Sequence, residues 1–134
     1  MTETTPFLMF CGLHAGQAEK AITWYVSLIN DSQIIEIDRY GGDEDEPEGS
    51  VRLARFTLAG REYMAIDSAE PHNFTFTPAF SIFVNVESES ELEKLYEALS
   101  KGGEVLMPLD DYGFSRKFGW VNDRYGVSWQ INLP

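Results

Sequence analysis

Cysteine, histidine and basic residues are scarce in this sequence of 134 residues. Cys11 is the one cysteine, which excludes an intrachain disulfide and a cysteine-cluster metal site. No apolar run approaches the roughly 20 residues that a membrane-spanning helix needs. The segment from Met1 to Thr5 has no basic start followed by an apolar stretch. We therefore expect no secretory signal and a cytoplasmic location.

The charge balance is strongly acidic, with 10 basic and 22 acidic residues and a net charge of −12. Phosphate backbones and anionic membranes are bound by clustered Lys and Arg, so we expect neither a nucleic-acid nor a membrane partner. Two runs concentrate the acid, and we interpret them as an exposed loop and a solvated helix face. They are Asp43, Glu44, Asp45, Glu46 and Glu48, and Glu87, Glu89, Glu91, Glu93 and Glu97.

The first half of the chain contains one helical stripe among several short apolar runs. Ala18, Ala21, Ile22 and Tyr25 recur at three- and four-residue steps, which is typical of a helix with one buried face. The expected elements are a strand at 7–11, this helix ending at 30–31, a strand at 34–37, an exposed loop at 41–50, and a hairpin of strands at 51–58 and 61–67 joined by Ala59 and Gly60.

The second half repeats the same order of elements. Ser88 with Glu91, and Ser90 with Glu93, each offer a capping box for a helix that Gly102 ends. The expected elements are a strand at 80–86, this helix, a short strand at 104–107, a loop at 108–113, and strands at 114–121 and 127–133.

The element order is therefore β-α-β-β-β, twice. This order predicts an α+β fold in a single domain over 1–134, with module 1 at about 5–68 and module 2 at about 79–134. One helix covers only one face of its sheet, so each module keeps a face that must meet something else. If the two open faces turn toward each other, they enclose a cavity between curved mixed sheets.

Three segments carry a resemblance to a known family. They are Pro6 to Phe10, Ala18 to Tyr25, and the most specific one, Gly119 to Asn132. The chain resembles the vicinal oxygen chelate superfamily of glyoxalases, bleomycin-resistance proteins and dioxygenases, and its PhnB-like branch most of all. That branch often carries the label 3-demethylubiquinone-9 3-methyltransferase. Methyl-donor cofactors are usually held by a glycine-rich turn in a doubly wound sheet, and this sequence does not predict one.

The resemblance implies where metal-dependent members hold a divalent ion. The ligand positions fall near Thr5, Ser81 and Gln130, with a fourth in 63–67. Hydroxyls are poor ligands for zinc, nickel or iron, and Asp67 alone cannot hold such an ion. We interpret His14 and His72 as surface residues. We therefore expect no bound metal and no cofactor.

Strand alternation indicates which side chains face the expected cavity. Arg55 is open to two interpretations, as a cavity cation that seeks an anionic group or as a surface residue paired with an acid. Trp120 is equally open between the core and a stacking surface. The expected ligand-binding residues are Phe7, Met9, Arg55, Ser81, Phe83, Asn85, Trp120, Gln130 and Asn132.

No catalytic residues are expected, because no Ser or Cys has a His within a recognisable motif. The favoured function is a metal-free small-molecule binding module. The alternative is a metal-dependent isomerase, lyase or dioxygenase of the same superfamily, and a third possibility is a domain acting through protein contacts. Proteins of this fold commonly pair, so we expect a homodimer.

Overall fold

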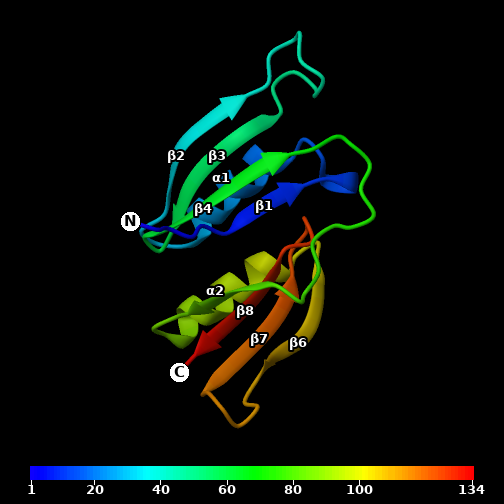
Figure 1. Ribbon diagram of the computed structural model, residues 1–134. Coiled ribbons are helices and arrows are strands. Elements are labelled where there is room, and N and C mark those ends of the chain that lie inside the picture. The colour runs from blue at the N-terminus through cyan, green and yellow to red at the C-terminus, as the bar shows by residue number, and fades with distance from the viewer. The chain divides into compact units, whose positions relative to one another are not determined.

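The computed structural model describes residues 1–134, which divide into two compact units, Met1–Thr75 and Phe76–Pro134. Each unit consists of one α-helix and one four-stranded sheet in the order β-α-β-β-β (Figure 1). The paired βαβββ arrangement that the sequence predicts is confirmed. The fold is α+β, with two mixed sheets.

In the first unit, strand β1 runs parallel to β4, and the other neighbouring strands are antiparallel. The strand order is β1-β4-β3-β2. A short 3-10 helix lies between β1 and α1, in the segment where the sequence has Leu13 and His14. The elements are β1 (Phe7–Phe10), η1 (Gly12–His14), α1 (Ala18–Leu28), β2 (Gln33–Arg39), β3 (Val51–Leu58) and β4 (Arg61–Asp67).

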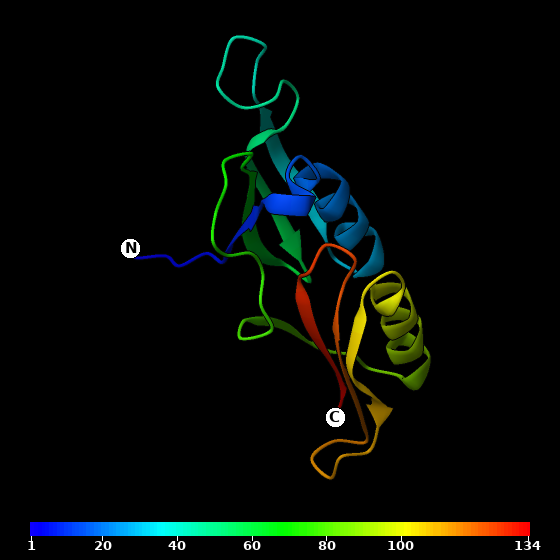
Figure 2. The same ribbon diagram turned by 90° about the vertical axis from the view of Figure 1, so that its right-hand side faces the viewer.

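Helix α1 covers one face of this sheet (Figure 2). Ala21, Ile22 and Tyr25 of the helix are fully buried, as the helical stripe predicts. Ala54 and Phe56 of β3 are buried with them. Because alternate residues of a strand point to opposite faces, the remaining positions lie on the face that no helix of this unit covers.

Asp67, at the end of β4, fixes three parts of the first unit. Its Oδ1 accepts hydrogen bonds from the backbone N–H groups of Gly16 (2.9 Å) and Ala18 (3.0 Å), at the start of α1. Its Oδ2 accepts one from the N–H of Val51, where β3 begins (2.8 Å). A carboxylate at this place satisfies helix N–H groups that have no intrahelical partner. The residue is 2% exposed.

The second unit repeats this design in the strand order β5-β8-β7-β6, with β5 and β8 parallel. Of the two possible capping boxes, the structure uses Ser88: its hydroxyl accepts from the N–H of Glu91 (3.1 Å). Leu92 and Leu99 of the helix and Trp129 of the sheet are fully buried in the core. The elements are β5 (Ser81–Asn85), α2 (Glu89–Ser100), β6 (Glu104–Asp110), β7 (Lys117–Asn122) and β8 (Ser128–Leu133).

Two sequence-based boundaries in this unit are wrong. β6 continues through Pro108 to Asp110, where a loop is expected, and β7 begins at Lys117 rather than at 114. β6 is an edge strand with two register shifts, and an edge or bulge tolerates a proline that cannot donate a hydrogen bond. Phe80 precedes β5 and is 59% exposed, so it does not extend the helix-side core.

Neither α-helix is long and apolar enough to cross a membrane. The single-domain assignment and the enclosed cavity stay predictions.

Candidate functional site on the uncovered sheet faces

We use the term open face for the side of each sheet opposite its own helix. On the second sheet, the register aligns three strands into one row, with Phe83 beside Gln130 and Gln130 beside Trp120. Met107 of β6 continues the row at the edge. Nine central residues make up this open face: Ser81, Phe83, Asn85, Phe118, Trp120, Asn122, Ser128, Gln130 and Asn132.

Gln130 is the central residue of this face. It is half-buried, and its side-chain amide has no hydrogen-bond partner in the protein. Phe83 on one side is 52% exposed, and Trp120 on the other side is half-buried. An amide with a free donor and a free acceptor therefore lies between two aromatic side chains.

The neighbouring row consists of Ser81, Ser128 and Asn122. Hydrogen bonds link two of these residues to each other and to Trp120. The indole Nε1 of Trp120 donates to Ser128 Oγ (2.8 Å), and the hydroxyls of Ser128 and Ser81 are 2.8 Å apart. Ser81 Oγ also lies 3.4 Å from the carbonyl of Pro78, to which it can donate, and either serine can be the donor in the bond between them. Both hydroxyls are thus hydrogen-bonded within the protein.

The third row consists of Asn85, Asn132 and Phe118, and its two asparagines are hydrogen-bonded to each other. Ser115 donates to Asn132 Oδ1 (2.5 Å), and Asn132 Nδ2 donates to Asn85 Oδ1 (2.9 Å). The two asparagines are partners in the β5–β8 register, as the alternation predicts. These bonds fix the orientation of the Asn132 amide, since its oxygen and nitrogen have different partners.

Aromatic residues gather beside this row around Phe118. Its ring lies edge-on to Tyr112 (6.1 Å between centroids) and Phe114 (5.0 Å), and it is 6.3 Å from Phe83. Phe118 itself is buried, while Phe83, Tyr112 and Phe114 are exposed. Phe118 is not among the ligand-binding residues expected from the sequence, although its spacing of two from Trp120 places both on one face.

Asn122 is a second residue that the sequence reading missed. It pairs with Ser128 in the register and so lies on the open face. Its Oδ1 is buried and has no hydrogen-bond partner. The backbone is tightly packed at the same point, because a Cβ on Gly103 would come within 2.0 Å of the carbonyl oxygen of Asn122.

The open face of the first sheet has a different character. Phe7, Met64 and Arg55 form one row, and Glu36 of β2 completes it. Phe7 is exposed and Met9, two residues on, is half-buried.

Arg55 lies on this face but is not free for an anion. Its Nε and Nη2 donate to the two oxygens of Glu62 (3.1 and 3.0 Å), and Nη1 reaches Glu36 (3.4 Å). The hydrogen bonds from Arg55 lower the pKa of the Glu62 carboxyl. Of the two interpretations of Arg55, the structure therefore has the residue paired with acids.

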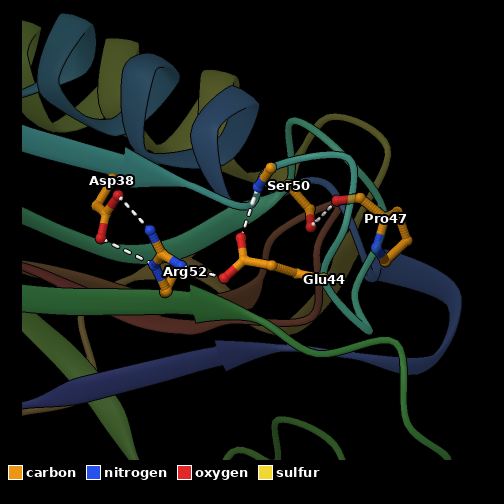
Figure 3. A network of polar contacts seen from close by, with 6 residues as sticks. Asp38, Glu44, Pro47, Ser50 and Arg52 are labelled. Atoms are coloured by element: carbon orange, nitrogen blue, oxygen red, sulfur yellow. Dashed lines mark hydrogen bonds and ion pairs between the residues drawn. The ribbon is translucent and has the colours of Figure 1, made fainter.

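The acidic loop between β2 and β3 is held by a second arginine (Figure 3). Arg52 donates to both oxygens of Asp38 (2.9 and 3.1 Å) and forms an ion pair with Glu44. Glu44 also accepts from the N–H of Gly41 (2.6 Å), and Ser50 donates to the carbonyl of Pro47 (2.6 Å). These bonds hold part of the acidic loop in a defined conformation.

The positions that the resemblance implies for a metal do not fit a transition-metal ion. Ser81 offers a hydroxyl that is bonded to Ser128 and Pro78, and Gln130 offers an amide. Asp67 of β4 is buried and bonded to backbone N–H groups. No group of three or more His, Cys, Asp or Glu side chains is placed to hold a metal ion. The donor set has no imidazole, and its one carboxylate, Asp67, already accepts backbone hydrogen bonds, whereas zinc and iron prefer imidazole and carboxylate ligands.

The structure contains one serine–histidine contact that the sequence does not predict. Ser68 Oγ and His72 Nε2 are 3.0 Å apart in the exposed segment after β4. The imidazole stacks on Phe74 (4.9 Å between centroids), and its Nδ1 has no hydrogen-bond partner. A catalytic serine needs a base that a third group orients, together with donors for the oxyanion. This pair has neither, so it does not define a nucleophile.

Solved structures of other proteins have a similar fold. The structure resembles a glyoxylase/bleomycin resistance protein/dioxygenase domain from Frankia sp. EAN1pec, with a TM-score of 0.62 and 17% identity over 99% of this chain and 97% of the other. This likeness identifies the fold as glyoxalase-like.

The family is narrower than the fold. A family model described as 3-demethylubiquinone-9 3-methyltransferase matches residues 2–132, and the chain belongs to this family. A PhnB protein from Bacillus cereus is 49% identical, with a TM-score of 0.93 over 99% of this chain and 100% of the other. Protein YjdN from Escherichia coli (strain K12) is 24% identical over 96% of this chain and 93% of its own length. The PhnB-like resemblance expected from the sequence is confirmed.

Proposed function

We propose that this chain is a metal-free small-molecule binding module that holds its ligand on the open face of the second sheet. The observation that carries the proposal is the free amide of Gln130 between Phe83 and Trp120. Ligand sites are mostly apolar surfaces with a few polar groups that fix orientation. This row has that composition, and no helix of its unit covers it.

The order of the surrounding groups supports binding. The bonds from Trp120 through Ser128 to Ser81, and those from Ser115 through Asn132 to Asn85, hold six side chains in place before any ligand arrives. A site that is organised in advance loses less conformational entropy on binding. The assignment of Phe7, Met9 and Arg55 on the first sheet as ligand-binding residues stays a prediction.

The alternative is a metal-dependent isomerase, lyase or dioxygenase, which the fold allows by analogy. Nothing in the donor chemistry of Thr5, Ser81 or Gln130 favours it. The family description also names methyl transfer. A turn with two glycines does follow β1, but the N–H groups of Gly16 and Ala18 at the start of α1 are bonded to Asp67. Two of the donors at that helix end are therefore already occupied by a carboxylate, whose negative charge would repel a cofactor anion, and we do not propose methyl transfer.

A thermal-shift screen of small aromatic and amide compounds tests the proposal. We expect at least one compound to raise the melting temperature of the wild-type protein, because a ligand that binds only the native state stabilises it. Gln130→Ala should weaken that shift without unfolding the chain, and Gln33→Ala on β2 is the matched control. Trp120→Ala should also weaken binding.

Two outcomes would overturn the proposal. A screen in which Gln130→Ala and Trp120→Ala leave the shifts unchanged would move the site elsewhere. Stoichiometric zinc, nickel or iron in the purified protein, with metal-dependent turnover of a hemithioacetal or a catechol, would establish the enzyme alternative.

A homodimer is a further part of the proposal. Tyr112 and Phe114 form an exposed, stacked aromatic pair beside the binding row, and exposed apolar groups of this kind mark contact surfaces. Sedimentation at micromolar concentration should give twice the chain mass of 15.2 kDa. A monomer under those conditions would contradict this part. The cytoplasmic location stays a prediction.

A further inference from the structure

We infer that the ligand of the second open face is a neutral planar molecule with an amide-like edge, in which an N–H lies beside a C=O. This inference rests on the proposed function and names the class of ligand. It follows from three properties of the face: its lack of charge, the hydrogen bonds of its hydroxyls within the protein, and the position of Gln130 between two rings.

The first property is the charge. None of the nine central residues of this face is ionisable, and the charges that the register adds are the acids Glu104 and Asp110 on the edge strand β6. Lys117 of β7 pairs with Glu89 and Glu93 of α2, so its charge is neutralised at the helix. An anionic ligand would lose its hydration without gaining a cation, which is costly. A neutral ligand avoids this cost.

The second property is the supply of donors. Ser128 and Ser81 are hydrogen-bonded to each other, Ser128 also accepts from Trp120, and Ser115 donates its proton to Asn132. Asn122 also has an unpartnered amide oxygen, but that atom is buried. The amide of Gln130 is therefore the central group with both a donor and an acceptor available to a ligand. A primary amide presents these two atoms side by side, and the complementary partner presents N–H and C=O in the opposite order.

The third property is the shape of the row. Phe83 and Trp120 lie on the two strands next to Gln130, so any group that bonds the amide lies between aromatic side chains. The indole of Trp120 is fixed by its bond to Ser128. Rings in such positions favour flat ligands, because offset or edge-on packing adds to the area that is buried.

Three two-ring probes separate these properties. 2-Quinolone is neutral and has the N–H beside C=O, quinoline has a ring nitrogen that only accepts, and 2-naphthoate is an anion of similar size. The readout is the set of three indole N–H signals in a ¹H–¹⁵N spectrum. We expect 2-quinolone to shift the signal of Trp120 and to leave that of Trp129 in place, because the Trp129 indole is bonded to Asp123 in the core (2.8 Å).

We expect quinoline and 2-naphthoate each to bind about tenfold more weakly than 2-quinolone, the ratio that one lost hydrogen-bond pair or one unpaired charge gives. Gln130→Met, which keeps the length and removes the amide, should bind 2-quinolone and quinoline equally. Gln33→Met is the matched control and should keep the tenfold preference.

The inference and the proposed function fail in different ways. Equal shifts of the Trp120 signal by all three probes would overturn the inference and leave a binding face. Tighter binding of 2-naphthoate would overturn it in favour of an anionic ligand. Absence of any shift at Trp120 would also overturn it, and the thermal-shift screen with Gln130→Ala then decides the proposed function separately.

Discussion

Trp120 Nε1 and Ser128 Oγ, on neighbouring strands of the second sheet, are joined by a 2.8 Å hydrogen bond that fixes the indole on the open face. Ser128 is 1% exposed, so its side of this hydrogen bond is shielded from water. The bond links the stability of the unit to the geometry of the proposed site, since the same serine also bonds Ser81.

Replacing this serine tests that link. Ser128→Ala removes a partner from Trp120 and from Ser81, and we expect it to lower the free energy of unfolding by about 1–3 kcal/mol. Urea denaturation measures this change, with Ser100→Ala at the end of α2 as the control. A loss no larger than that of the control would show that the polar series does not stabilise the sheet.

Removing the carboxylate of Asp67 should cost more. Asp67→Ala leaves the N–H groups of Gly16, Ala18 and Val51 without their acceptor in a buried place. We expect a loss of about 3 kcal/mol or more in the free energy of unfolding, because each buried unpaired N–H costs about 1–3 kcal/mol. Asp45→Ala in the exposed loop is the control. If both variants unfold at the same urea concentration, the capping role is wrong.

The ion pair of Glu62 with Arg55 predicts a pH dependence. Its hydrogen bonds lower the pKa of Glu62 in the folded protein, so the pair stabilises the fold at pH values above the ordinary glutamate pKa of about 4.3. That contribution is lost as the pH falls through the lowered pKa. The difference in unfolding free energy between wild type and Glu62→Gln should therefore be largest near pH 6 and shrink toward pH 3.

The control for this pH series is Glu97→Gln on α2, a residue in no ion pair. Both halves of the Glu62 pair are partly exposed, so solvent screens the effect and added salt should reduce it. A difference that grows on acidification would contradict the assignment.

The turn between β3 and β4 contains a residue, Ala59, whose replacement should stabilise the protein. Ala59 has φ 50° and Gly60 has φ 82°, as the two central positions of a type I′ turn require. Alanine pays about 1–2 kcal/mol for the left-handed conformation, and asparagine is the favoured residue there. Ala59→Asn should raise the melting temperature, whereas Ala69→Asn, in the segment after β4, should not. A lower melting temperature for Ala59→Asn would contradict the turn assignment.

Most of the fold follows from local patterns in the sequence. The stripe Ala18, Ala21, Ile22 and Tyr25 predicts α1, and the Ala59–Gly60 pair predicts the hairpin, because both signals depend on residues close in the chain. β6 is harder to predict, since Pro108 is tolerated only because β6 is an edge strand. That property depends on the strand order of the whole unit.

The site was harder to predict than the fold. Period-two alternation places Ser81, Phe83 and Asn85 on one face of β5, and Gln130 and Asn132 on the same face of β8. The cluster around Phe118 depends on where Tyr112 and Phe114 fold back, which no period encodes. The pairing of Arg55 likewise depends on the β3–β4 and β2–β3 registers, which bring Glu62 and Glu36 within reach.

A crystal structure of the protein with a compound from the thermal-shift screen tests the central claim most directly. We predict difference density on the open face of the second sheet, within hydrogen-bond distance of the Gln130 amide and against Phe83 and Trp120. Density at another place, or a Gln130 amide already bonded to protein atoms with no room beside it, would contradict the account.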